Sequence, residues 1–182
     1  MRVTLQALGC RLNEAELETW ARQFQQLGHQ VTTEETSADL VVINTCAVTQ
    51  EAVRKSRKVL RRTQRANPRA RIVVSGCFAT LETQALAQEG GIDLPIPNQE
   101  KDHLVTTVTT ELDLPAMPLS AMAAGANPLF ARGRQRAFIK VQDGCRYRCA
   151  FCIVTLARGD ERSRPVPEVV DEINRGSVEG VR

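Results

Sequence analysis

Six cysteines are the residues of this 182-residue sequence whose type and spacing could support chemistry. Three are dispersed over the first half and three lie close together later: Cys10, Cys46, Cys77, Cys145, Cys149 and Cys152. Thiolates are ligands for zinc and for iron–sulfur clusters. The sequence has only two histidines, which argues against the usual Cys–His zinc sites.

The composition is that of an ordinary soluble globular protein, with 42% hydrophobic and 25% charged residues. The first residues lack the apolar core of a signal peptide, and no run approaches eighteen apolar residues. We therefore expect a cytoplasmic chain with no membrane partner. In that compartment thiols stay reduced, so metal binding or catalysis is favoured over structural disulfides.

The later cysteines, called the compact triplet below, have the spacing C-x3-C-x2-C at Cys145, Cys149 and Cys152. Three thiolates this close could hold three irons of a 4Fe–4S cube and leave the fourth iron open for a substrate or cofactor. The alternative is a zinc knuckle with a fourth ligand elsewhere. The nearest histidine is His103, and no cysteine follows the triplet.

The first half of the sequence alternates apolar runs, typical of buried strands, with amphipathic segments of helical period. We expect strands at residues 2–8, near 31, at 39–43 and at 71–75, and helices at 13–27, 49–66 and 81–88. This alternation predicts an α/β fold with a parallel, Rossmann-like sheet and right-handed crossovers.

The earlier cysteines, called the dispersed triplet, each follow one of these strands. Cys10 follows the first, Cys46 ends the run LVVINTC, and Cys77 ends IVVSGC. Open α/β sheets bind ligands at the carboxyl edge of the strands, so the three thiols are expected to converge there. The alternative is that they are ordinary buried core residues, since cysteine behaves as a small hydrophobe.

Residues 136–142 alternate as a strand just before the compact triplet, which would place the cysteine loop on the active face of a barrel-type fold. Residues 114–133 are rich in Ala, Pro and Gly and are expected to form a linker. We therefore divide the chain into a domain at 1–113, the linker, and the start of a (β/α) partial barrel at 134–182.

Residues 54–71 contain nine basic side chains and no acidic one. Such a stripe suits contacts with RNA phosphates, which give affinity and salt dependence without reading the base sequence. The alternative is a solvated helix face. The candidate RNA-binding residues are Arg54, Lys55, Arg57, Lys58, Arg61 and Arg62.

Several motifs resemble those of radical S-adenosylmethionine (SAM) enzymes. The compact triplet, with Phe151 before its last cysteine, is similar to the radical SAM signature. The stretch KVQDGCRYRCAFCIVTLARGDERSRP looks like the methylthiotransferase branch of that superfamily. LGCRLNEAE, VVINTCAVTQEAVRKSRK and IVVSGCFAT resemble the N-terminal domain of the same branch. These matches follow in order over most of the chain and include all six cysteines.

The resemblance implies two 4Fe–4S clusters, each with one open iron. The compact triplet would hold the cluster that binds SAM and cleaves it, after one-electron reduction, to a 5′-deoxyadenosyl radical. The dispersed triplet would hold an auxiliary cluster that presents or supplies sulfur, which a second SAM methylates. An electron donor such as a flavodoxin or ferredoxin is implied as a partner.

Within this branch, LGCRLNEAE and VQDGC look closest to enzymes that act on threonylcarbamoyladenosine beside the tRNA anticodon, so tRNA and not DNA is the expected partner. Alternatives within the family are the isopentenyladenosine tRNA methylthiotransferases and the enzymes that modify a ribosomal-protein aspartate. Thr155 and Leu156 depart from the Pro and aromatic residue of many relatives. Arg158, Arg162 and Arg164 could face SAM or phosphate, or belong to an exposed loop.

After the compact triplet, the chain has room for barely one strand–helix unit of the barrel that this resemblance implies. We therefore expect a truncated radical SAM domain that could bind the auxiliary cluster but would not turn over. Two hypotheses outside the family are a zinc-binding RNA module and a corrinoid- or nucleotide-binding α/β domain with incidental cysteines.

Overall fold

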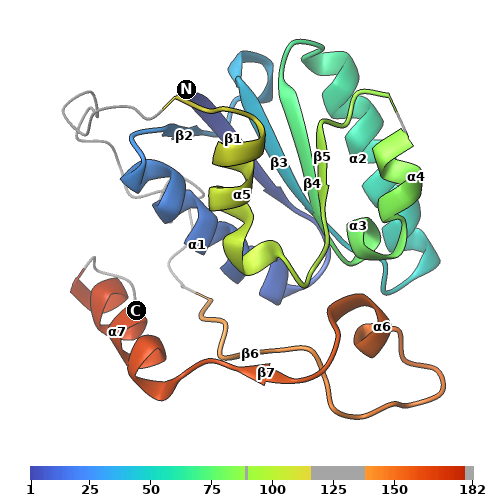
Figure 1. Ribbon diagram of the computed structural model, residues 1–182, viewed down its shortest axis with the longest axis vertical. Helices are drawn as coiled ribbons and strands as arrows, with labels where there is room; N and C mark the ends of the chain where they lie inside the picture. Colours follow the sequence, from blue (N-terminus) through green and yellow to red (C-terminus); the bar gives the residue numbers. More distant parts are fainter. Residues whose placement is uncertain (89, 116–137, 179–182) are drawn as a thin grey trace.

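The computed structural model describes residues 1–88, 90–115 and 138–178. Its centre is a five-stranded parallel sheet in the order β2-β1-β3-β4-β5 (Figure 1). The strands are β1 (Arg2–Ala7), β2 (Gln30–Thr32), β3 (Leu40–Thr45), β4 (Arg71–Gly76) and β5 (Leu94–Ile96). The predicted α/β class with a parallel sheet is confirmed.

Helices cover both faces of the sheet (Figure 1). On one face lie α1 (Arg11–Gln26) and α5 (Leu104–Glu111), and on the other lie α2 (Gln50–Ala66), α3 (Cys77–Leu81) and α4 (Thr83–Gln88). Two short 3-10 turns, η1 (Glu35–Ser37) and η2 (Lys101–His103), complete this part of the chain.

The strand β3 shows why the sheet is buried on both sides. Leu40 and Val42 pack into the core under α1 and α5, whereas Val41 and Ile43 pack into the core under α2, α3 and α4. Alternate side chains of a strand point to opposite faces, so a continuous apolar run serves two cores at once. The second helix begins where Thr49 accepts a hydrogen bond from the amide of Ala52 at 3.1 Å.

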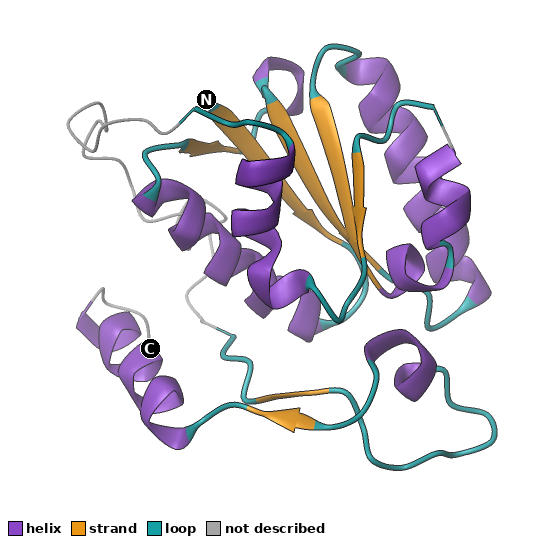
Figure 2. Ribbon diagram, viewed as in Figure 1, coloured by secondary structure: helices purple, strands orange, loops and turns teal. Residues whose placement is uncertain are grey.

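The later part of the chain contains β6 (Gln142–Asp143), α6 (Val154–Arg158), β7 (Arg162–Ser163) and α7 (Val166–Val178). Figure 2 shows the β6–β7 ribbon and α6 lying below the carboxyl ends of the main strands. Residues 138–178, called the docked segment below, meet the part of the chain that forms the five-stranded sheet and its helices through α6, which packs against α3.

Three differences from the sequence-based expectations concern element bounds. A strand is expected from the sequence at 136–142, but the described residues form only the two-residue β6 at its end. It is this short because it pairs only with the equally short antiparallel β7 among the described residues. The helix expected at 81–88 is preceded by a separate short helix that begins at Cys77. The expected linker lies outside the described residues from 116 onward, and Leu114 is buried in the core beside α5.

Within the described residues, no helix combines the length and the apolar character needed to cross a bilayer.

Candidate functional site

The dispersed triplet lies along the carboxyl edge of three adjacent strands. Cys10 follows β1 and precedes α1, Cys46 follows β3 directly, and Cys77 begins α3 immediately after β4. The sheet order reverses between β1 and β3, where the chain turns first toward β2 and then toward β4. Such a switch point is where doubly wound α/β sheets place their ligand crevice. The predicted convergence of the three cysteines at this edge agrees with the topology.

The thiols influence one another electrostatically. Burial raises the pKa of the Cys46 thiol, and the charges of Cys77 and Cys10 raise it further. Cys46 and Cys77 are buried, whereas Cys10 is exposed. The triplet therefore has two sulfurs in the protein interior and one at the rim.

Two glycines permit this approach. Gly9 and Gly76 precede Cys10 and Cys77 with φ of +93° and +94°, in the region that favours glycine. A Cβ at Gly9 would lie 2.6 Å from the sulfur of Cys46, and one at Gly76 would collide with the backbone of Thr45. The space beside the Cys46 sulfur exists because position 9 has no side chain.

Ser56 of α2 fixes the loop that carries Cys46. Its hydroxyl donates to the Cys46 carbonyl at 3.0 Å and accepts from the Cys46 amide at 3.3 Å. The helix that carries the basic stretch is therefore tied directly to one cysteine of the dispersed triplet.

Polar side chains contact two of the three sulfurs. Asn13 Oδ1 lies 3.7 Å from the Cys10 sulfur, and Arg158 Nη2 lies 3.9 Å from the same sulfur. Asn98 Nδ2 donates to the sulfur of Cys77 at 3.6 Å. These three side chains form a polar rim around the thiols.

The compact triplet lies on a loop of the docked segment. The amide of Cys145 donates to the carbonyl of Gly159 at 3.2 Å, and the amide of Cys152 donates to the carbonyl of Cys149 at 3.0 Å. Cys149 is exposed and Cys145 and Cys152 are partly buried. Phe151 is 95% exposed, so the aromatic residue of the signature projects from the loop into solvent.

A buried ionic network joins the docked segment to α1 and to Lys101 of η2. Glu16 of α1 contacts the Lys101 ammonium at 2.6 Å and the Arg158 guanidinium at 3.2 Å. Asp143 of β6 contacts the same two cations, at 2.7 and 2.9 Å. Burial alone would raise the pKa of Asp143, but Lys101 and Arg158 hold it well below its usual range.

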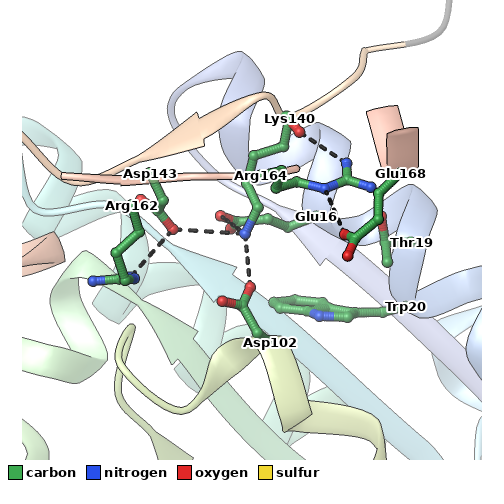
Figure 3. A pocket seen from close by; sticks show the side chains of 9 residues that line it. All are labelled: Glu16, Thr19, Trp20, Asp102, Lys140, Asp143, Arg162, Arg164 and Glu168. Atoms are coloured by element: carbon green, nitrogen blue, oxygen red, sulfur yellow. Dashed lines mark hydrogen bonds and ion pairs between the residues drawn. The ribbon is translucent and has the colours of Figure 1, made fainter. Parts of the chain in front are cut away.

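Next to this network is a cavity of about 290 Å³ between α1 and the β6–β7 ribbon (Figure 3). Lys140 points into it and lies 2.8 Å from Asp102, 3.6 Å from Asp143 and 3.8 Å from Glu16. Arg162 approaches Asp143 at 3.7 Å and Arg164 approaches Glu168 at 3.9 Å. The cations of this cavity thus face carboxylates of the protein itself.

The basic residues of α2 lie on its exposed side. Arg62 pairs with Glu35 at 2.8 Å, and Arg57 lies 3.9 Å from Glu82 and stacks over the Phe78 ring. Within the described residues, no carboxylate partner is recorded for the other basic side chains of the helix. A surface hollow is lined by Arg54, Arg57, Lys58, Arg61, Arg62, Arg65 and Ala66.

Residues 2–96, which contain β1 to β5 and the dispersed triplet, match the family described as "Uncharacterized protein family UPF0004". The chain belongs to this family.

Relatives of this chain bear out the resemblance to methylthiotransferases. The threonylcarbamoyladenosine tRNA methylthiotransferase MtaB of Aquifex aeolicus is 33% identical over 95% of this chain and 44% of its own length. MtaB of Chlamydia pneumoniae is 36% identical over 93% of this chain and 38% of its own length. The tRNA-2-methylthio-N(6)-dimethylallyladenosine synthase of Chloroherpeton thalassium is 33% identical over all of this chain and 42% of its own length. The chain therefore spans less than half the length of these relatives.

A solved structure shares the fold. The radical S-adenosylmethionine methyltransferase TsrM from Kitasatospora setae matches all of this chain and 46% of its own, with a TM-score of 0.57 and 16% identity. At this identity the likeness shows a shared fold and no more.

The dispersed triplet fits an iron–sulfur cluster by its donor chemistry. It offers three thiols at one sheet edge, a space beside Cys46 that a Cβ at Gly9 would fill, and N–H donors from Arg158 and Asn98 to the sulfurs. In the described residues, no three His, Cys, Asp or Glu side chains are arranged to hold a single metal ion. Each thiolate of a cube binds a different iron, so its sulfurs stand farther apart than the ligands of one ion.

Sequence reasoning missed the side chains around the sulfurs. Asn98 and Lys101 lie in no motif, and Glu16 ends the motif LGCRLNEAE without a role assigned to it. The roles of all three depend on contacts across the fold. Arg158, for which the sequence left SAM, phosphate or an exposed loop open, is instead buried against Glu16, Asp143 and the Cys10 sulfur.

Proposed function

We propose that this chain provides the cluster-binding part of a radical SAM tRNA methylthiotransferase with two 4Fe–4S clusters. Cys10, Cys46 and Cys77 hold one cluster and the compact triplet holds the other. The observation that carries this proposal is the convergence of the dispersed triplet at the switch point of the sheet, beside the segment that bears the compact triplet. When bound, the clusters and SAM supply radical formation and sulfur transfer.

The residues of this chain position these groups. Gly9 leaves space beside Cys46, Ser56 fixes its loop, and the docked segment brings the compact triplet to the same side of the sheet. Arg54, Lys55, Lys58 and the other basic residues of α2 contact tRNA phosphates. Cys145, Cys149 and Cys152 would hold the cluster to which a donor such as a flavodoxin or ferredoxin would supply electrons.

The finer proposal is that the substrate nucleoside is threonylcarbamoyladenosine. It is supported by the MtaB enzymes of Aquifex aeolicus and Chlamydia pneumoniae among the relatives. The dimethylallyladenosine synthase of Chloroherpeton thalassium, at 33% identity, makes 2-methylthiolation of that nucleoside the second candidate. Methylthiolation of a tRNA nucleoside is common to both candidates.

Iron and sulfide analysis with electron paramagnetic resonance (EPR) tests the two-cluster proposal. Anaerobically reconstituted chain is expected to contain about eight irons. The triple variants Cys10→Ala/Cys46→Ala/Cys77→Ala and Cys145→Ala/Cys149→Ala/Cys152→Ala are each expected to contain about four. Zinc without sulfide, or unchanged iron in both triple variants, would refute the proposal.

A further inference from the structure

Arg158 has a position that the proposed function does not require. It ends α6 of the docked segment and is only 5% exposed. Its Nη1 donates to Asp143 at 2.9 Å and to Glu16 at 3.2 Å, and its Nη2 donates to Asn13 Oδ1 at 2.6 Å. The same Nη2 lies 3.9 Å from the Cys10 sulfur. Nη1 thus donates to the two carboxylates, while Nη2 faces Asn13 and the Cys10 sulfur of the dispersed triplet.

The contact of Arg158 with sulfur is made in addition to its two ion pairs. Glu16 and Asp143 contact the buried cations Lys101 and Arg158, and Lys140 lies within 3.8 Å of both carboxylates. The guanidinium carries five N–H donors, more than its two carboxylates require. An N–H group of Nη2 therefore remains available to the Cys10 sulfur after the carboxylates are satisfied.

Asn98 provides a second donor in the same way. Its Nδ2 reaches the Cys77 sulfur at 3.6 Å and the carbonyl of Ala157 at 2.6 Å, and its Oδ1 accepts from Lys101 at 3.1 Å. Ala157 and Arg158 are neighbours at the end of α6. The end of this one helix therefore supplies the donor to Cys10 and fixes the amide that donates to Cys77.

We propose, on the basis of the function proposed above, that the end of α6 tunes the auxiliary cluster of the dispersed triplet through Arg158 and Asn98. Both act as positioning residues that donate hydrogen bonds to ligand sulfurs. Such donors stabilise the more negative, reduced state of a cluster and raise its reduction potential. The segment that carries the compact triplet thereby sets the potential of the other cluster.

The test uses the full chain with Cys145→Ala/Cys149→Ala/Cys152→Ala, so that only the auxiliary cluster is present. The bond from the Cys145 amide to Gly159 involves backbone atoms and is retained. A redox titration followed by EPR gives the midpoint potential, with iron content measured alongside. Arg158→Gln is expected to move the potential to a more negative value while iron stays at about four per chain. Arg158→Lys keeps the positive charge, so its midpoint potential is expected to lie between those of the parent chain and Arg158→Gln.

Asn98→Ser is the second variant, for the case in which Arg158→Gln does not fold. A serine hydroxyl is too short to reach the Cys77 sulfur, so the potential is expected to fall in the same direction. The matched control is Arg22→Gln, which removes an arginine that links α1 to Glu172 of α7 at 2.5 Å. In the described part of the chain, Arg22 makes no hydrogen bond to a cysteine. Its potential is expected to equal that of the parent chain.

The outcomes separate this inference from the proposed function. A parent chain that binds no iron would overturn both. A parent chain that binds iron, with the same potential in Arg158→Gln and Asn98→Ser, would overturn the inference alone. An equal shift in Arg22→Gln would show that loosened docking causes the change, and would also overturn it.

Discussion

Among single residues, Gly9 controls how closely the loops of Cys10 and Cys46 approach. Gly9→Ala would place a Cβ 2.6 Å from the Cys46 sulfur and force alanine to adopt φ of +93°. We expect a loss of about 1–3 kcal/mol in the free energy of unfolding. We also expect less iron at the dispersed triplet, measured by thermal unfolding and iron analysis.

Gly90→Ala is the matched control, because a Cβ at Gly90 meets no heavy atom within 4 Å. It is expected to leave both measurements unchanged. Full iron loading and parent-like stability in Gly9→Ala would contradict the close approach of these two loops.

His29 is a buried histidine whose charge the fold opposes. Burial lowers its pKa, and the positive amino terminus lowers it further. Neither ring nitrogen has a hydrogen-bond partner among the described residues. On acidification below about pH 6.5, the His29 imidazole therefore binds a proton more readily in the unfolded chain than in the folded chain. The contribution of neutral His29 to the free energy of unfolding is fully present above about pH 6.5 and is lost as the pH decreases below it.

We expect the melting temperature of the parent chain to fall on acidification through this range, and His29→Leu to flatten that dependence. His103→Gln is the control, because His103 lies at the exposed start of α5. An acid slope that His29→Leu leaves unaltered would assign the effect to other groups.

At the scale of elements, α2 combines an anchored end with a charged outer face. Ser56 ties it to Cys46, and its basic side chains line a surface hollow. We expect Arg54→Gln and Arg61→Gln each to weaken tRNA binding and to reduce the slope of log affinity against log salt by about one. Filter binding at several salt concentrations measures both quantities.

Arg2→Gln is the control for this helix, because Arg2 lies at the amino end of β1, opposite the cysteine edge. It is expected to leave the salt slope as it is. Equal salt slopes in the parent chain, Arg54→Gln, Arg61→Gln and Arg2→Gln would favour a solvated helix face without RNA contact.

The success of sequence reasoning also differs between elements. Apolar runs such as residues 40–43 predicted β3 because both faces of that strand are buried. The helix α5 was missed because LVTTVTTE is rich in β-branched residues, which favour strands. It is helical because Leu104, Val105 and Val108 pack into the core beside α1. The cysteine positions followed from strand ends, whereas Asn98 and Arg158 meet the sulfurs through contacts that no local pattern encodes.

At the scale of the whole molecule, Glu16 joins α1 to the docked segment through Arg158. It is 3% exposed and contacts Lys101 and Arg158, with Asn44 donating to it at 2.8 Å. Glu16→Gln leaves two buried cations with one carboxylate fewer, so we expect a loss of about 3–5 kcal/mol. Hydrogen exchange is expected to rise first in residues 138–164, and denaturant unfolding measures the total.

Asp102→Asn is the comparison, because Asp102 pairs with Lys140 at 2.8 Å but is half exposed. Its cost is expected to stay below about 1 kcal/mol. Similar costs for the two variants would mean that the docked segment is not held by the buried network.

The parallel sheet imposes an order of events on a newly made chain. Cys10, Cys46 and Cys77 meet only after β1, β3 and β4 have paired, and such pairings between distant segments form slowly. The cysteines at 145–152 are neighbours in any conformation of the chain. In the proposed two-cluster protein, iron could therefore collect on the later cysteines before the chain has folded, whereas the earlier cysteines would bind it only after the sheet has formed. The site whose ligands are synthesised first is the last that can be filled.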